Sequence, residues 1–159
     1  MRFNEIGPIG NVTAIYSSAE RKAREGASIL SEHVGTMPHV IEPLHENDRS
    51  ATGFLPPDEF ERVADAFFAR PYESVRGWER ANDAQARIVA AVETLLNTDR
   101  TSGDLAIVAH GAVGALLLCH LMGTAIDRMH DQPANGGGNY FAFAREDLRL
   151  LHGWRAIDD

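Results

Sequence analysis

The chain has 159 residues, of which 44% are hydrophobic and 24% charged, and this composition suits one globular domain with its own core. A formal net charge of −8 argues against nucleic acid or an acidic membrane surface as the main partner, because both bind basic faces. The sequence also shows no uncharged apolar window of about 18 to 20 residues and no signal-peptide pattern, so we expect a cytoplasmic protein.

The first part of the chain predicts two short strands with a helix between them. Residues 12–16 form an apolar run rich in β-branched side chains, and two serines at 17–18 end it. These hydroxyls suit the start of a helix over 19–31. A second short strand, over 39–41, is flanked by prolines. The alternation is typical of an α/β domain.

Residues 44–103 are predicted to form a loop and helical insert over the site. A polar loop over 44–57 contains glycine and a Pro-Pro pair, which break regular structure. Helices follow over 58–69 and 78–96, each with apolar residues at helical spacing. No repeat or linker is evident, so we expect one domain over 1–159.

Residues 104–123, DLAIVAHGAVGALLLCHLMG, combine a strand, a histidine and a helix. The aliphatic run 105–109 is typical of a buried parallel strand, and 113–121 of a covered helix. His110 then lies between them, followed by Gly111 at the turn. Ligands bind at the carboxyl ends of parallel strands, and helix amino termini favour anions. The segment therefore predicts an anion site that contains an imidazole.

The carboxyl-terminal part predicts two further strands. Residues 140–143, YFAF, are rich in aromatic side chains and follow a run of three glycines at 136–138, and 148–154 again have strand character. Polar groups follow the three earlier strands, at 17–22, at 46–49 and at His110. If those strands are parallel neighbours, cations, a carboxylic acid and an imidazole meet on one rim, a set that suits phosphoryl chemistry.

Several segments resemble the histidine phosphatase superfamily, which contains the cofactor-dependent phosphoglycerate mutases and many small phosphatases. Residues 108–113, VAHGAV, are similar to the V-[SA]-H-G-G-V pattern that carries a catalytic histidine. Residues 18–27, SAERKAREGA, are similar to S-x-x-x-R-A-x-x-T-A, with Lys22 in place of the phosphate-binding arginine. Residues 44–53 resemble the E-x-x-x-x-x-G loop that supplies a proton donor, here Glu46.

Weaker similarities cover the rest of the chain. Residues 72–74 resemble the G-E-S segment before a long helix, with Arg87 at the helical arginine, and Asn139 opens a strand similar to N-x-x-[IF]. The resemblance implies a three-layer α/β/α fold, with a mostly parallel sheet like that of phosphoglycerate mutase. It also implies His110 and Glu46 as catalytic residues and a phosphate site made by the following residues: Lys22, Arg21, Ser18, Gly111 and Asn139. No cofactor and no metal are implied.

The resemblance leaves two assignments open. Lysine cannot make the bidentate fork of arginine, so either Lys22 or the adjacent Arg21 holds phosphate, and we rank Lys22 first because it occupies the motif position. Glu46, with Arg49 nearby, fits a surface salt-bridged loop as well as it fits a proton donor.

One feature of the family has no counterpart in the sequence. The family nucleophile is a histidine in an R-H-G motif at the end of a central strand, and nothing before residue 17 matches it. Either the chain starts at an internal methionine of a longer protein or it is a shortened relative without a phosphohistidine. We expect the longer protein, because removing a central strand leaves two rows of backbone groups unpaired.

The expected function is phosphomonoester hydrolysis through a phosphohistidine, acting on a small phosphorylated substrate. A relative that binds a phosphorylated ligand without turnover is the first alternative, and a phosphoglycerate mutase-type phosphotransferase is the second. The acidic insert disfavours the mutase, which needs a basic lid. A homodimer is left open as the assembly.

Overall fold

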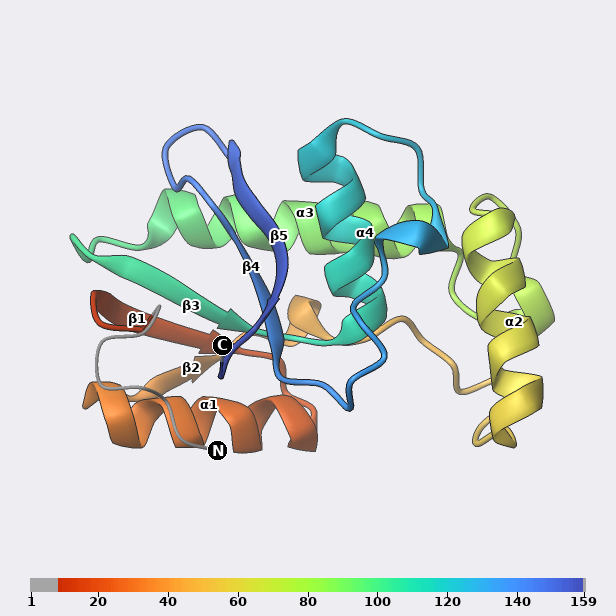
Figure 1. Ribbon diagram of the computed structural model, residues 1–159, viewed down its shortest axis with the longest axis horizontal. Coiled ribbons are helices and arrows are strands. Elements are labelled where there is room, and N and C mark those ends of the chain that lie inside the picture. The colour runs from red at the N-terminus through yellow and green to blue at the C-terminus, as the bar shows by residue number, and fades with distance from the viewer. Residues whose placement is uncertain (1–8, 159) are drawn as a thin grey trace.

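The computed structural model describes residues 9–158 as an α/β fold with one parallel sheet and one antiparallel hairpin (Figure 1). Its regular elements, including three 3₁₀ helices, are, in chain order, β1 (Val12–Ser17), α1 (Arg21–Val34), β2 (Pro38–Val40), η1 (Glu42–Leu44), α2 (Pro57–Ala69), η2 (Val75–Gly77), α3 (Ala81–Thr98), β3 (Asp104–Val108), α4 (Gly111–Met122), η3 (Arg128–His130), β4 (Asn139–Phe143) and β5 (Leu150–Ala156). The predicted order of strands and helices is confirmed.

The parallel sheet has the order β2-β1-β3, with β1 in the centre. Residue Ser17 pairs with Val40 on one side and with Val108 on the other, so the three strands end side by side. The connections after all three strands therefore begin at one edge of the sheet, as the sequence predicted.

Helices cover both faces of this sheet. Ile15 of β1 and Ala106 of β3 pack with apolar residues of α1, whereas Tyr16 and Ile107 pack with the cluster built by α3 and α4. Neighbouring residues of one strand point to opposite faces, which explains this division. The result is three layers, with α1 on one side and α3 and α4 on the other (Figure 1).

The aliphatic strand β3 is less buried than its sequence predicts. Leu105, Ala106, Ile107 and Val108 all keep intermediate exposure, whereas Ile15 in the central strand is fully buried. The reason is that β3 lies at the edge of its sheet in the described part of the chain. The prediction of a parallel strand is confirmed, and the prediction that this strand is buried is wrong.

The hairpin of β4 and β5 forms a separate antiparallel sheet that packs on α4. Phe141 and Trp154 meet edge to face, with ring centroids 4.8 Å apart. A Cβ built on Gly114 of α4 would lie 3.1 Å from the Trp154 ring, so a glycine permits this close packing.

The insert over 44–103 contributes much of the apolar core. Trp78 is 1% exposed and packs with Phe60 and Phe67 of α2, and the buried face of α3 packs on α4. The division of the chain into one domain with an insert stays a prediction.

A part-buried ion pair between Asp99 and Arg145 connects the parallel sheet to the turn after β4. The Asp99 carboxylate accepts hydrogen bonds from the Tyr16 hydroxyl and from Arg145, whose guanidinium lies 2.9 Å away. Arg145 also donates to the backbone oxygens of Thr101 and Gly103, ahead of β3. Asp99 is 3% exposed in its side chain, so this network fixes the hairpin against the start of β3.

Candidate functional site

His110 lies where the end of β3 meets the start of α4. It has extended backbone angles and precedes the first residue of α4, Gly111. Its side chain is 12% exposed, and its Nε2 atom lies 2.9 Å from the Ser18 hydroxyl at the end of β1. The sequence prediction that the ends of these two strands share a site agrees with this contact.

Glu20 contacts the same imidazole. One of its carboxylate oxygens lies 2.9 Å from His110 Nε2 and accepts a hydrogen bond of 2.7 Å from the backbone N–H of Glu46. The Glu20 side chain is 50% exposed. Sequence reasoning did not assign Glu20 a role, because its contact with His110 joins two loops that are distant in the sequence.

Glu46 occupies the amino terminus of α4. Its two carboxylate oxygens accept hydrogen bonds from the backbone N–H groups of Ala112 and Val113, at 3.1 and 3.0 Å. These donors have no partner within the helix, and the helix dipole favours a negative charge there. The anion site that the sequence predicted at this terminus therefore holds the protein's own carboxylate.

Arg87 of α3 fixes the loop that carries Glu46. Its guanidinium donates to the backbone oxygens of Pro43 and His45, each at 2.8 Å, and pairs with Glu79 at 2.8 Å. The side chain of Arg87 is 18% exposed. This arginine is a positioning residue for the Glu46 loop.

Asn47 adds a polar group that the sequence analysis missed. It is 3% exposed, and its side-chain oxygen accepts a hydrogen bond from Arg49 at 3.0 Å. Its Nδ2 group has no hydrogen-bond partner among the described residues. A water molecule or a ligand oxygen would satisfy this buried donor.

Gly111 and Asn139 are linked through the side chain of Gln132. A Cβ on Gly111 would lie 2.6 Å from Gln132 Nε2, and Gln132 accepts a hydrogen bond of 3.2 Å from Asn139. Asn139 also bonds with Asn135. The predicted residues Gly111 and Asn139 are thus joined by one intervening side chain.

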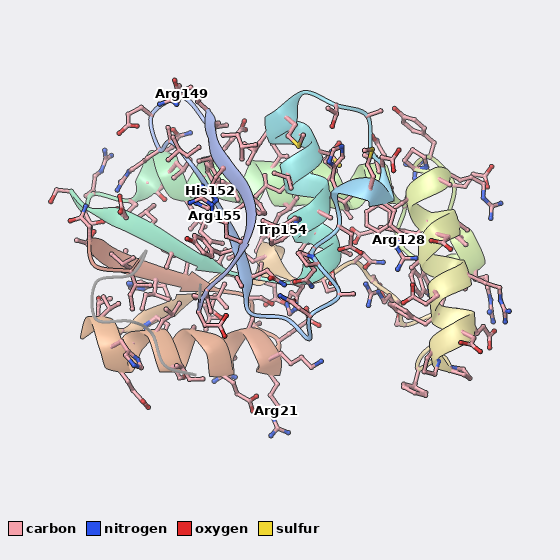
Figure 2. All side chains as sticks on the ribbon, viewed as in Figure 1. Arg21, Arg128, Arg149, His152, Trp154 and Arg155 are labelled. Carbon is pink, nitrogen blue, oxygen red and sulfur yellow. The ribbon has the colours of Figure 1, made fainter. Side chains whose placement is uncertain are left out.

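The two predicted cations lie on the exposed side of α1. Arg21 is 90% exposed and pairs with Glu25 at 2.7 Å, and Figure 2 shows its guanidinium pointing away from the rest of the chain. Lys22 is also exposed. In the arrangement described, Arg21 does not join His110, Ser18 and Glu46, so a role for either cation in binding phosphate stays a prediction.

Arg49 connects Glu46 to an aromatic hollow. Its guanidinium lies 3.7 Å from the Glu46 carboxylate and about 5 Å from the ring centroids of Phe60 and Trp78. These residues help to line a hollow of about 460 Å³, beside the strongly exposed Phe54. Phe60 thus belongs to a surface hollow, whereas Phe67 and Phe68 of the same helix are core residues.

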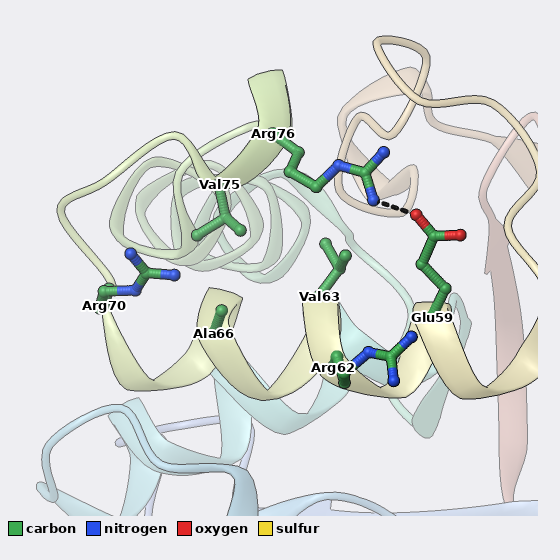
Figure 3. A pocket seen from close by; sticks show the side chains of 7 residues that line it. All are labelled: Glu59, Arg62, Val63, Ala66, Arg70, Val75 and Arg76. Atoms are coloured by element: carbon green, nitrogen blue, oxygen red, sulfur yellow. Dashed lines mark hydrogen bonds and ion pairs between the residues drawn. The ribbon is translucent and has the colours of Figure 1, made fainter.

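A second hollow, of about 340 Å³, lies between α2 and η2 (Figure 3). Three arginines and Glu59 surround an apolar floor that includes Val63 and Val75. Arg76 pairs with Glu59, and Arg70 pairs with Glu73. Because two of the three arginines are paired, we assign no ligand to this hollow.

Within residues 9–158, no three histidine, cysteine or acidic side chains are grouped to hold a metal ion. In the same range, no helix is both long enough and apolar enough to cross a membrane. Cys119 is buried, and burial raises the pKa of its thiol.

The parallel sheet, with an imidazole, a hydroxyl and a carboxylate gathered at its strand ends, defines an α/β protein with a polar site at the carboxyl edge of the sheet. More specifically, the chain belongs to the histidine phosphatase superfamily (branch 1), whose family model matches residues 8–152. No curated protein matches the chain significantly in sequence.

Solved structures share the fold at low sequence identity. A complex of a mycobacterial glucosyl-3-phosphoglycerate phosphatase with inorganic phosphate gives a TM-score of 0.71 at 20% identity, covering 93% of this chain and 79% of that one. The same mycobacterial enzyme with VO3 gives 0.64 at 23%, covering 76% and 64%. A protein titled "Mycobacterial hydrolase 2" gives 0.65 at 22%, covering 91% and 69%. The chain thus spans about two thirds to four fifths of these structures.

Proposed function

We propose that this protein is a phosphatase that hydrolyses small phosphomonoesters through a phosphohistidine. The observation that carries the proposal is the contact of His110, at the end of β3, with the Ser18 hydroxyl, beside an α4 amino terminus that already binds a carboxylate. Membership of the family supports phosphoryl chemistry at this position. Structural neighbours solved with inorganic phosphate and with VO3 support an oxyanion of this shape as the ligand.

The site residues have separate roles in this mechanism. The nucleophilic imidazole attacks phosphorus while the bond to the leaving oxygen breaks, and His110 donates a hydrogen bond to a phosphoryl oxygen. Glu46 gives a proton to the leaving alkoxide. Water then attacks the phosphohistidine, Glu46 takes the proton from that water, and inorganic phosphate leaves. Lys22, after a side-chain rotation, neutralises charge on the phosphoryl group.

The nucleophile in this proposal comes from a strand that pairs with β3. In the described part of the chain, the His110 imidazole contacts Ser18 and Glu20. Among residues 9–158, β3 pairs with a strand on one side only, and β4 and β5 form a separate two-stranded sheet, so both sheets have edges without a strand partner in this range. A strand inserted between them would join the two sheets and end beside His110, which is why we favour this source for the nucleophile.

The leaving group has a natural place in the aromatic hollow. Arg49 contacts Glu46 and also stacks on Phe60, so the hollow begins at the proposed proton donor. Phe54 is 92% exposed at its rim. An apolar or ring-shaped leaving group would bury part of this surface when bound.

The test compares the 159-residue chain with the same chain extended by a strand and helix from a family member that carries the R-H-G motif. The chain alone should hydrolyse p-nitrophenyl phosphate negligibly, and the extended chain should hydrolyse it through a phosphohistidine detectable by ³¹P NMR. The matched control is the same extension with alanine in place of the motif histidine. A chain that hydrolyses the ester robustly by itself would refute the need for an added strand.

A protein that binds a phosphorylated ligand without turnover is the second candidate. The observation that favours it is that, within residues 9–158, the His110 imidazole contacts a hydroxyl and a carboxylate, those of Ser18 and Glu20. It predicts that inorganic phosphate binds in a His110-dependent manner and that the natural full-length protein, purified from its own cells, neither hydrolyses esters nor becomes phosphorylated.

A further inference from the structure

Two carboxylates of the protein occupy the groups that would bind phosphate. Glu46 accepts the N–H bonds at the start of α4, and Glu20 accepts from the Glu46 backbone while it contacts His110 Nε2. A carboxylate and a phosphate use the same donors, namely backbone N–H groups and an imidazole. The site is therefore filled by internal anions in the described conformation.

The two carboxylates differ in how easily they can leave. The Glu46 side chain is 15% exposed and is bound by two helix N–H groups and by the N–H of Asn47. The Glu20 side chain is 50% exposed and precedes the first residue of α1, outside the helix. A rotation of the Glu20 side chain into solvent breaks two polar contacts, one with His110 Nε2 and one with the backbone N–H of Glu46.

We propose that Glu20 is an internal competitor of phosphate, which must swing away from His110 before a phosphorylated ligand binds. The inference rests on the proposed function, because it takes His110 as part of a phosphate site. Glu20 then sets the affinity for weakly charged oxyanions. A ligand with two negative charges displaces Glu20 more readily than a ligand with one.

A positioning role for Glu20 predicts the opposite result. If Glu20 served to orient the imidazole for its ligand, its removal would weaken phosphate binding. If Glu20 competes with phosphate, its removal strengthens binding, because the donors of His110 and Glu46 become available and a negative charge next to the incoming anion disappears. The sign of the change therefore separates the two roles.

The test measures binding of inorganic phosphate to the 159-residue chain by calorimetry, at fixed pH and about 0.1 M ionic strength so that exposed charges are screened equally. Variants Glu20→Gln and Glu20→Ala remove the carboxylate, and Glu32→Gln, the matched control, removes an exposed carboxylate from the adjoining helix α1. His110→Asn reports whether phosphate binds at this site. Circular dichroism checks that each variant is folded.

We expect Glu20→Gln and Glu20→Ala to lower the Kd for phosphate about tenfold, equivalent to about 1.4 kcal/mol, with Glu32→Gln within about twofold of the wild type. The amide signal of Glu46 in ¹H–¹⁵N NMR should shift on phosphate addition, because its N–H is the donor that Glu20 releases.

Three results overturn the inference in distinguishable ways. Phosphate affinity that stays equal or falls in both Glu20 variants, while His110→Asn abolishes binding, overturns the competitor role and leaves the proposed function standing. Failure of phosphate to bind any variant overturns the inference alone, and binding that is unchanged in His110→Asn overturns the proposed function together with the inference.

Discussion

Replacing Asp99 by asparagine should lower the stability of the fold in a pH-dependent way. Burial raises the pKa of Asp99, but the hydrogen bonds from Thr101, Tyr16 and Arg145 outweigh burial and lower the pKa from its usual 3.8 to about 2. A carboxyl whose pKa falls by this amount on folding contributes about 2 kcal/mol to the free energy of unfolding. Because the Asp99 side chain is 3% exposed, solvent screening reduces this contribution little.

The sign of the pH dependence follows from the lowered pKa. The contribution of Asp99 is complete above its unfolded pKa of 3.8 and disappears as the pH falls through about 2. Asp99→Asn should therefore lose about 2 kcal/mol relative to the wild type at pH 7, and the difference should shrink below pH 4. Urea unfolding followed by circular dichroism at pH 7, 5 and 3 measures this difference.

Asp147→Asn is the matched control for this experiment. Asp147 is 63% exposed and lies 4.0 Å from Arg149, and such a pair contributes less than about 0.5 kcal/mol. A loss below about 0.5 kcal/mol for Asp99→Asn at pH 7, or a difference that is unchanged at pH 3, would refute the reasoning.

Two further substitutions test the local structure. Glu46→Ala should lower the free energy of unfolding by about 1 kcal/mol, because it removes the carboxylate that caps α4. Glu42→Ala, at an exposed position, is the control. Equal stability of the two variants in urea unfolding would refute a capping role for Glu46. Gly103→Ala should cost about 2 kcal/mol or more, because its Cβ would lie 2.5 Å from the backbone oxygen of Asn11. Gly153→Ala, whose Cβ meets nothing within 4 Å, should leave the midpoint of thermal unfolding unchanged, and a similar loss in both variants would contradict this explanation.

Local sequence patterns were sufficient to predict the elements that carry the site. The aliphatic run before His110 and the apolar run after Gly111 correspond to β3 and α4, whose bounds differ from the prediction by one or two residues. The reason is that a short β-branched run and a long apolar helix have distinct lengths and flanking residues. Parallel pairing then follows from the helix between consecutive strands.

The contacts inside the site could not be predicted from the sequence. Glu20 reaches His110 across 90 positions of sequence, and Glu46 reaches α4 across more than 60. No periodicity encodes such contacts, because they depend on which loops the sheet edge brings together. The partial exposure of β3 was also missed. The hydrophobicity of a strand indicates that it can be buried, but it does not indicate whether a second strand pairs with it on its other side.

The two internal carboxylates explain how an anion site can exist in a protein of net charge −8. Buried hydrogen-bond donors need partners. The fold would therefore be less stable if the N–H groups of α4 and the part-buried imidazole had no acceptor. Glu46 and Glu20 supply those partners from separate loops and so connect the ends of β1, β2 and β3. In the function and the competitor role that we propose, a phosphorylated ligand replaces at least the exposed partner, so part of its binding energy is used to displace Glu20. The contacts that stabilise the unliganded site must be broken when such a ligand binds, so they lower its net affinity. This cost discriminates against monoanions, which bind weakly.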